Sequence, residues 1–206
     1  MQAMARFQWE CAAFFRSIAP EAGSPLVFGD GPIKAPVLML IGEAPGEQEA
    51  LQGRPFVGKA GKNLESFLSI LGLKRSEIYV TNVVKFRPTK RSPSGGTANR
   101  PPTKEERLLF TPWLMREIDL VRPGALVTLG NVALQAFRDD AIGQCHGAWS
   151  RAVAAPPGKP ALTLPLFPLY HPASIIYNPA LKETYQTDLL ALKASLSEGS
   201  SPGNDS

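Results

Sequence analysis

Short apolar runs alternate with amphipathic segments along most of this chain. The runs 37–41, 78–84 and 125–129 are short and apolar, which is typical of strands buried on both faces of a sheet. A fourth run, 161–169, is predicted to be the last core strand before His171. The remaining predicted elements are helices over 5–17, 61–71, 103–121, 131–138 and 178–196, and a further strand over 149–153.

Local signals support two of these helix boundaries. Thr103 is followed three residues later by Glu106, which is the pattern of a capping box. Pro112 lies inside the helix that follows, and we expect it to kink that helix. Asn178 and Pro179 are typical of an N-cap and a first helical residue.

The repeated alternation of strand and helix predicts an α/β fold, a three-layer αβα sandwich with a central, mainly parallel four-stranded sheet. We expect one domain over residues 1–196 and a disordered tail over 197–206, which is rich in Ser, Gly, Asp and Asn. Ligands of such folds bind beyond the carboxyl ends of the strands. The segments after Ile41, Val84 and Leu129, and the one after Leu169, are therefore predicted to form the site.

The basic residues are concentrated in one stretch. The net charge is only +4 at pH 7, but residues 85–107 contain seven basic side chains against two acidic ones. A localised positive segment is suited to a polyanion such as the DNA backbone. A solvated loop with surplus lysines is the alternative interpretation.

Other classes of protein are disfavoured by what the chain lacks. It has only two cysteines, Cys11 and Cys145, and no second CxxC element, so we expect free thiols and neither a disulfide framework nor a metal site. The apolar runs are far shorter than a membrane span, and the first residues do not resemble a signal peptide, so a soluble intracellular protein without a membrane partner is expected.

Five motifs follow in order, most of them at predicted strand ends. They are GEAPG at 42–46, GRPFVGKAG at 53–61, TNVVK at 81–85 with Arg87-Pro88, Asn99-Arg100, and HPAS at 171–174. The glycine-rich turn fits neither GxGxxG nor the P-loop, so no nucleotide cofactor is expected. Together, over roughly 11–196, the motifs resemble family 4 of the uracil-DNA glycosylase superfamily.

This resemblance implies a monofunctional enzyme of base excision repair; with only two cysteines in the chain, no cofactor is expected. It would hydrolyse the N-glycosidic bond of a uracil flipped out of DNA and leave an abasic site. The expected partners are uracil-containing DNA, single- or double-stranded, and uracil as the product. The resemblance also implies a monomer in the cytoplasm of a bacterium, associated with the nucleoid.

The resemblance assigns catalytic roles to Glu43, Asn82 and His171, and their chemistry suits the reaction. Glycoside hydrolysis passes through a cationic sugar and a departing base anion. Glu43 is expected to orient the attacking water and to stabilise the sugar. His171 would donate to the uracil carbonyl oxygen; in other oxyanion sites the loss of such a donor costs about 3 to 4 kcal/mol. The amide of Asn82 can match N3–H and O4 of uracil.

The remaining site residues are expected to hold uracil and DNA. Phe56 would stack on the base and Glu49 would crowd C5 of uracil against thymine's methyl group, although a core ring and a surface carboxylate are the plain alternatives. The rest of the predicted uracil pocket is Gly42 and Ala44. The predicted DNA contacts are Lys85, Arg87, Lys90, Arg91, Asn99, Arg100, Ser174, Ile175 and Ile176. One isoleucine would act as a wedge, or both belong to the core.

The chain departs from the family at its iron-sulfur cluster. The family holds four irons with four cysteines, and the corresponding positions here are Cys11, Phe14, Phe86 and Phe110. One thiolate cannot hold such a cluster. We expect the three phenylalanines to fill its volume, each ring contributing about 1.5 to 3 kcal/mol by burial.

A second departure is an insertion over 89–98. A related branch of the superfamily traps DNA covalently through a histidine in a basic insertion, whereas no histidine occurs between Lys85 and Arg107. Hydrolytic turnover is therefore expected. His146 lies where the family often has a basic residue, and either a surface position or a phosphate contact fits it.

Three other functions compete with this interpretation. A relative acting on hypoxanthine or xanthine would share the motifs, and Asn82 is the residue that favours uracil. A catalytically silent module that binds DNA lesions is disfavoured by the presence of Glu43, Asn82 and His171. An unrelated nucleotide-binding α/β protein is disfavoured by the missing phosphate fingerprint.

Overall fold

A computed structural model describes residues 2–19, 25–93 and 95–197 of the chain. The predicted tail over 197–206 lies outside the described residues, apart from Ser197 at the end of the last helix.

The core of the fold is a five-stranded sheet in the order β2-β1-β5-β7-β6. Its strands are β1 (Leu38–Gly42), β2 (Ile78–Asn82), β5 (Ala125–Leu129), β6 (Ser150–Ala154) and β7 (Leu162–Leu169). The first four in spatial order are parallel, and β6 pairs antiparallel with β7. The predicted α/β class and mainly parallel sheet are confirmed.

The predicted number of four strands in the sheet is wrong, because the further strand predicted over 149–153 is present as β6 and joins the sheet at its edge. Arg151 and Val153 are exposed while Ala152 and Ala154 are buried, so β6 alternates in burial as a strand at a sheet edge does. The strands buried on both faces are continuous apolar runs, which are easier to identify from sequence.

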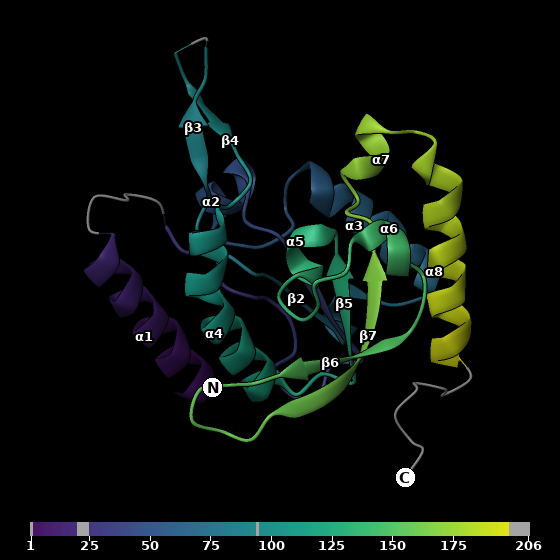
Figure 1. The fold of residues 1–206 in the computed structure, drawn as a ribbon, viewed down its shortest axis with the longest axis horizontal. Helices are drawn as coiled ribbons and strands as arrows, with labels where there is room; N and C mark the ends of the chain where they lie inside the picture. Colours follow the sequence, from purple (N-terminus) through teal and green to yellow (C-terminus); the bar gives the residue numbers. More distant parts are fainter. Residues whose placement is uncertain (1, 20–24, 94, 198–206) are drawn as a thin grey trace.

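Helices cover both faces of the sheet (Figure 1). The four long ones are α1 (Gln2–Ile18), α3 (Lys59–Leu71), α4 (Lys104–Val121) and α8 (Leu181–Ser197). Successive side chains of β1 point to opposite layers: Leu38 and Leu40 pack with α3 and α8, whereas Met39 and Ile41 pack with α1 and α4. This alternation places the two layers and confirms the sandwich.

The capping box predicted at the start of α4 is present. The Thr103 hydroxyl accepts the N–H of Glu106 at 3.2 Å, and the Glu106 carboxylate accepts the N–H of Thr103 at 2.7 Å. The helix then continues through Pro112 to Val121.

Several short elements that the sequence pattern did not predict cluster near the carboxyl ends of the parallel strands (Figure 1). The helix predicted over 131–138 lies there as the shorter α5 (Asn131–Leu134). The unpredicted elements are α2 (Glu47–Gln52), α6 (Ile142–Cys145), α7 (Ser174–Tyr177) and a hairpin of β3 (Thr89–Arg91) and β4 (Thr97–Asn99); a 3₁₀ turn, η1 (Arg75–Glu77), precedes β2. Each is too short for a hydrophobic period to be read. Together they frame the end of the sheet where a ligand is expected.

An aromatic cluster joins α1, α4 and the segment after β2. The rings of Phe15, Phe86 and Phe110 lie 5.1 to 5.7 Å apart, and buried Cys11 belongs to the same core. The prediction that Phe14 belongs to this group is wrong. Its ring lies 5.4 Å from that of Trp113, because the next residue on α1, Phe15, faces the sheet instead.

Candidate active site

The site begins where β1 and β2 end side by side. Gly42 pairs with Asn82 in the parallel register, and Asn82 is only 4% exposed. A Cβ atom on Gly42 would lie 2.4 Å from Oδ1 of Asn82 and 2.7 Å from the ring of Phe56. Glycine is therefore required at 42 so that the amide and the ring can approach each other over the strand end.

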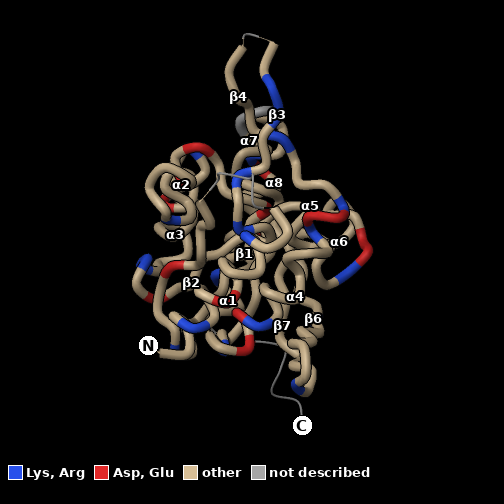
Figure 2. The backbone as a smooth tube through the Cα atoms, turned by 90° about the vertical axis from the view of Figure 1, so that its left-hand side faces the viewer, with Lys and Arg blue, Asp and Glu red and all other residues tan. Residues whose placement is uncertain are grey.

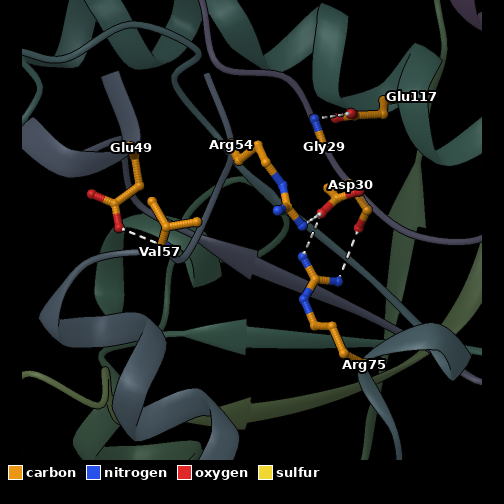
Figure 3. A network of polar contacts seen from close by, with 7 residues as sticks. All are labelled: Gly29, Asp30, Glu49, Arg54, Val57, Arg75 and Glu117. Carbon is orange, nitrogen blue, oxygen red and sulfur yellow. Dashed lines mark hydrogen bonds and ion pairs between the residues drawn. The ribbon is translucent and has the colours of Figure 1, made fainter. Parts of the chain in front are cut away.

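Phe56 adopts a conformation that is rare for a residue with a side chain. Its φ is +56°, in the left-handed region, so the loop around it must be held firmly. On one side Arg54 pairs with Asp30 at 3.0 Å; on the other, the N–H of Val57 donates to Glu49 at 3.1 Å (Figure 3). These contacts hold the loop on both sides of Phe56 and so fix the position of its ring.

Glu49 organises the two glycine-rich loops. Its carboxylate accepts backbone N–H groups from Gly46 at 3.1 Å, Val57 at 3.1 Å and Gly58 at 2.7 Å. At 8% exposure it is not the surface carboxylate of the alternative interpretation. The first contact closes the start of α2 and the other two hold the loop before α3, so one side chain joins both loops.

His171 follows the end of β7 and presents a defined tautomer. Its Nδ1 accepts the N–H of Ala173 at 3.1 Å, so the proton of the neutral ring is on Nε2. Burial lowers the pKa of His171, because the charged imidazolium is poorly solvated there. The site therefore contains a neutral imidazole with its N–H donor on Nε2.

A cleft with a volume of about 530 Å³ joins these groups. Six of the predicted site residues line it: Ala44, Glu49, Phe56, Asn82, Asn99 and His171. Six further lining residues were not predicted: Gly46, Glu47, Gln48, Gly58, Lys59 and Ala60. The unpredicted residues come from the starts of α2 and α3. These helix starts lie beside the strand ends only in the folded chain, so the local sequence pattern does not identify them.

Glu43 is not among the residues that line this cleft. It lies between Gly42 and Ala44, and its carbonyl accepts the N–H of Val84 at 3.1 Å. Burial raises the pKa of its carboxyl group, and the positive charge of Arg107 opposes that rise. The structure thus places Glu43 next to the cleft, with a carboxyl group that takes up a proton more readily than usual.

Comparison with known proteins identifies the family. Residues 28–192 match the model of the uracil DNA glycosylase superfamily. The chain is 36% identical over 179 residues to the Type-4 uracil-DNA glycosylase of Saccharolobus solfataricus, covering 82% of this chain and 75% of that protein. It is 37% identical to the Type-4 uracil-DNA glycosylase of Sulfurisphaera tokodaii, covering 80% and 72%. The chain belongs to the uracil DNA glycosylase superfamily.

Among solved structures, wild-type SMUG2 of Pedobacter heparinus aligns with this superfamily member at a TM-score of 0.47 and 13% identity, covering 81% of this chain and 77% of that one.

Two of the predicted DNA-binding residues, Lys85 and Arg100, make their contacts within the protein instead. The prediction for Lys85 is wrong: the side chain is fully buried, and its Nζ lies 2.5 Å from Oε2 of Glu117. Arg100 is held by a bidentate pair with Glu106 at 2.6 and 2.7 Å and by the carbonyls of Thr89 and Pro101, so it fixes the base of the hairpin.

Other predicted contacts lie at the surface or at the rim of the cleft. Lys90 and Arg91 are exposed on β3 of the hairpin, which projects from the body of the glycosylase-superfamily fold (Figure 2). Arg87 donates to Oδ1 of Asn99 at 2.7 Å and pairs with Glu47 at 3.3 Å. Asn99 therefore connects the hairpin to the cleft.

The segment after His171 supports the core interpretation for Ile175. Ser174 and Ile175 begin α7, and the Ile175 side chain packs against the core of the α3 and α8 layer. The side chain of Ile176 lies outside the described residues. His146 is neither alone nor on an open surface, because its Nδ1 lies 2.8 Å from Asp188 and its ring 4.7 Å from that of Tyr170.

The residues at the family's cluster positions do not fit an iron-sulfur cluster. Phe86 and Phe110 pack against Phe15, where thiolates would be needed. Burial raises the pKa of Cys11 to about 12, so this thiol is protonated rather than a thiolate ligand.

Within the described residues, no helix has the length and apolar character needed to cross a membrane.

Proposed function

We propose that this chain is a monofunctional uracil-DNA glycosylase that hydrolyses the bond between a flipped-out uracil and its deoxyribose. The observation that carries the proposal is the convergence of Asn82, Phe56 and His171 on one cleft at the carboxyl end of a parallel sheet. The similarity to Type-4 uracil-DNA glycosylases over most of the chain supports the same activity.

Base recognition would rest on Asn82 and Phe56. The amide of Asn82 can accept from N3–H and donate to O4 of uracil, whereas cytosine presents the opposite pattern at these positions. The ring of Phe56, held at a positive φ beside the amide, would stack on the base, an interaction worth about 1 to 3 kcal/mol in single-strand binders. Both groups meet over Gly42. The face of the base against Phe56 and the edge of the base against Asn82 would therefore be fixed together.

His171 would stabilise the leaving group. As the bond between the sugar carbon and N1 breaks, its electron pair moves onto the base, and the neutral Nε2–H of His171 can donate to the carbonyl oxygen that gains charge. Glu43 would orient the water that attacks the sugar carbon and accept its proton. The raised pKa of Glu43 suits a proton acceptor, and its place between two site residues brings it near the reaction.

DNA would be held mainly at the rim of the cleft. Lys90 and Arg91 on the exposed strand β3 can reach phosphates beside the flipped nucleotide, and Arg87 and Asn99 link that hairpin to the cleft. We propose that the protein acts as a monomer on the nucleoid in the bacterial cytoplasm, releases uracil, and needs no cofactor.

The test is base release from oligonucleotides with a single uracil, single-stranded and paired with guanine. We expect release by the wild-type protein and a loss of at least about a hundredfold in the single-turnover rate for Asn82→Ala and His171→Ala, as for the loss of an oxyanion donor elsewhere. Glu65→Ala, on the exposed face of α3, is the matched control. No release of uracil by the wild-type protein would refute the proposal. Faster release of hypoxanthine or xanthine would support the related activity instead.

A further inference from the structure

A buried polar network lies beneath Asn82, on the side of β2 that faces α4. Its centre is the ion pair of Lys85 and Glu117, both of whose side chains are completely buried. Glu117 also accepts from the Tyr79 hydroxyl at 2.9 Å and from the Thr81 hydroxyl at 2.9 Å. The N–H of Gly29 donates to the same carboxylate at 3.2 Å (Figure 3). Four donors therefore satisfy this one carboxylate.

Lys85 uses all three of its donors within the protein. Its Nζ bonds to Oε2 of Glu117 at 2.5 Å, to the Thr81 hydroxyl at 2.7 Å and to the main-chain carbonyl of Asn82 at 2.7 Å. A buried ammonium without spare protons cannot serve a DNA phosphate. Its third bond is directed instead at the peptide group of the residue proposed to read the base.

This third bond matters because Asn82 ends β2. A carbonyl at a buried strand end has no further strand partner and needs another donor. On the other side, the chain after Asn82 is held by bonds from the N–H groups of Val83 and Val84 to the carbonyls of Gly42 and Glu43, at 2.9 and 3.1 Å. Lys85 thus fixes the peptide plane that follows Asn82, and with it the direction of the Asn82 side chain.

We propose that Lys85 and Glu117 are positioning residues for base recognition, acting through the main chain of Asn82. The inference rests on the proposed uracil glycosylase activity. An error of about 1 Å in the placement of a reacting partner can cost a hundredfold in rate. Loss of the network is therefore expected to lower catalysis even though neither residue lines the cleft.

The experiment replaces the pair together, because removing one partner would leave a buried charge unpaired. In Lys85→Met/Glu117→Gln we expect the single-turnover rate on uracil DNA to fall about 10- to 100-fold, with little change in the Kd for DNA. Arg116→Met/Glu10→Gln is the matched control, because that ion pair links α1 to the same helix α4 without touching the site. It should lower the melting temperature and leave the rate within about twofold of wild type.

A double-mutant cycle separates a positioning role from a structural one. If the network acts through Asn82, adding the paired substitution to Asn82→Ala should change the rate by less than about threefold. Rates that multiply instead would overturn the inference, as would a wild-type rate in the folded paired variant. Absence of activity in the wild-type protein would refute the proposed function, a different result.

A milder variant covers the case in which the paired variant does not fold. Thr81→Val keeps both charges and nearly the same shape but removes the hydroxyl that bridges Lys85 and Glu117. It should lower the rate in the same direction by a smaller factor and also be masked by Asn82→Ala. A Thr81→Val protein with unchanged rate and unchanged discrimination between uracil and cytosine would refute the inference.

Discussion

Replacing Glu49 by glutamine tests whether one carboxylate maintains the shape of the cleft. The residue joins the loop after β1 to the loop before α3 through three backbone N–H groups, those of Gly46, Val57 and Gly58. Glutamine keeps nearly the same volume and one oxygen. The other oxygen becomes an NH₂ group, which cannot accept a hydrogen bond.

The expected size of the effect follows from the geometry. The oxygen that accepts from Val57 and Gly58 can be retained, so the loss falls on the bond from Gly46, where two donors would face each other. Hydrogen bonds to charged groups contribute about 1.5 to 3 kcal/mol. For a protein of this size, about 2 kcal/mol corresponds to a fall in Tm of about 4 to 8 °C.

The assay combines thermal unfolding with single-turnover release of uracil, and Glu65→Gln on the exposed face of α3 is the control. We expect Glu49→Gln to lower both the Tm and the rate, because the loop that holds Phe56 loses part of its anchor. A wild-type Tm and rate would contradict the role assigned to Glu49. Release of thymine by Glu49→Ala with an unchanged rate on uracil would favour exclusion of the thymine methyl group as its main task.

Three further predictions concern the hairpin, Glu43 and the aromatic cluster. Lys90→Ala/Arg91→Ala should weaken DNA binding and reduce the slope of log Kd against log salt by about 2, whereas Arg151→Ala on β6 should not; an unchanged slope would exclude phosphate contacts by the hairpin. Activity should fall as the pH drops through the pKa of Glu43, which burial raises above its ordinary value, because the carboxylate is the active form. A pH–rate profile of Glu43→Gln that keeps this fall would assign it to another group. Phe110→Ala should lower the free energy of unfolding by about 3 to 5 kcal/mol in urea titrations, and a cost below about 1 kcal/mol would contradict tight packing of the cluster.

Most of the sheet could be predicted from sequence because its inner strands are buried on both faces. The residues of β1 and β5, for example, form continuous apolar runs whose period cannot be mistaken for that of a surface helix. The edge strand β6 was predicted as a strand over 149–153 but not as part of the sheet, and the hairpin of β3 and β4 was not predicted. Their pairing depends on which segment lies beside them, and this is decided by the tertiary fold.

The site residues could be predicted where a motif lies at the end of a strand. They were harder to predict where a polar side chain is buried in the core instead of pointing to the solvent. Asn82 and His171 occupy the predicted cleft because they lie at the ends of β2 and β7, whereas Phe56 comes from the loop between α2 and α3. Lys85 was expected to bind DNA because it begins a basic stretch. Nothing local in the sequence identifies its partner, Glu117, which is 32 residues away in the chain.

Three consecutive residues after β2 connect the buried polar network, the aromatic cluster and the rim of the cleft. Lys85 lies under Asn82, Phe86 packs between Phe15 and Phe110, and Arg87 bonds to Asn99 at the rim of the cleft. A shift of the Phe86 ring would therefore move its neighbours in both directions along the chain. Phe86 and Phe110 thus do more than fill the core. They hold the segment that leads to Asn82 on one side and to Arg87 at the base of the β3–β4 hairpin on the other, so aromatic packing supports the geometry of the cleft.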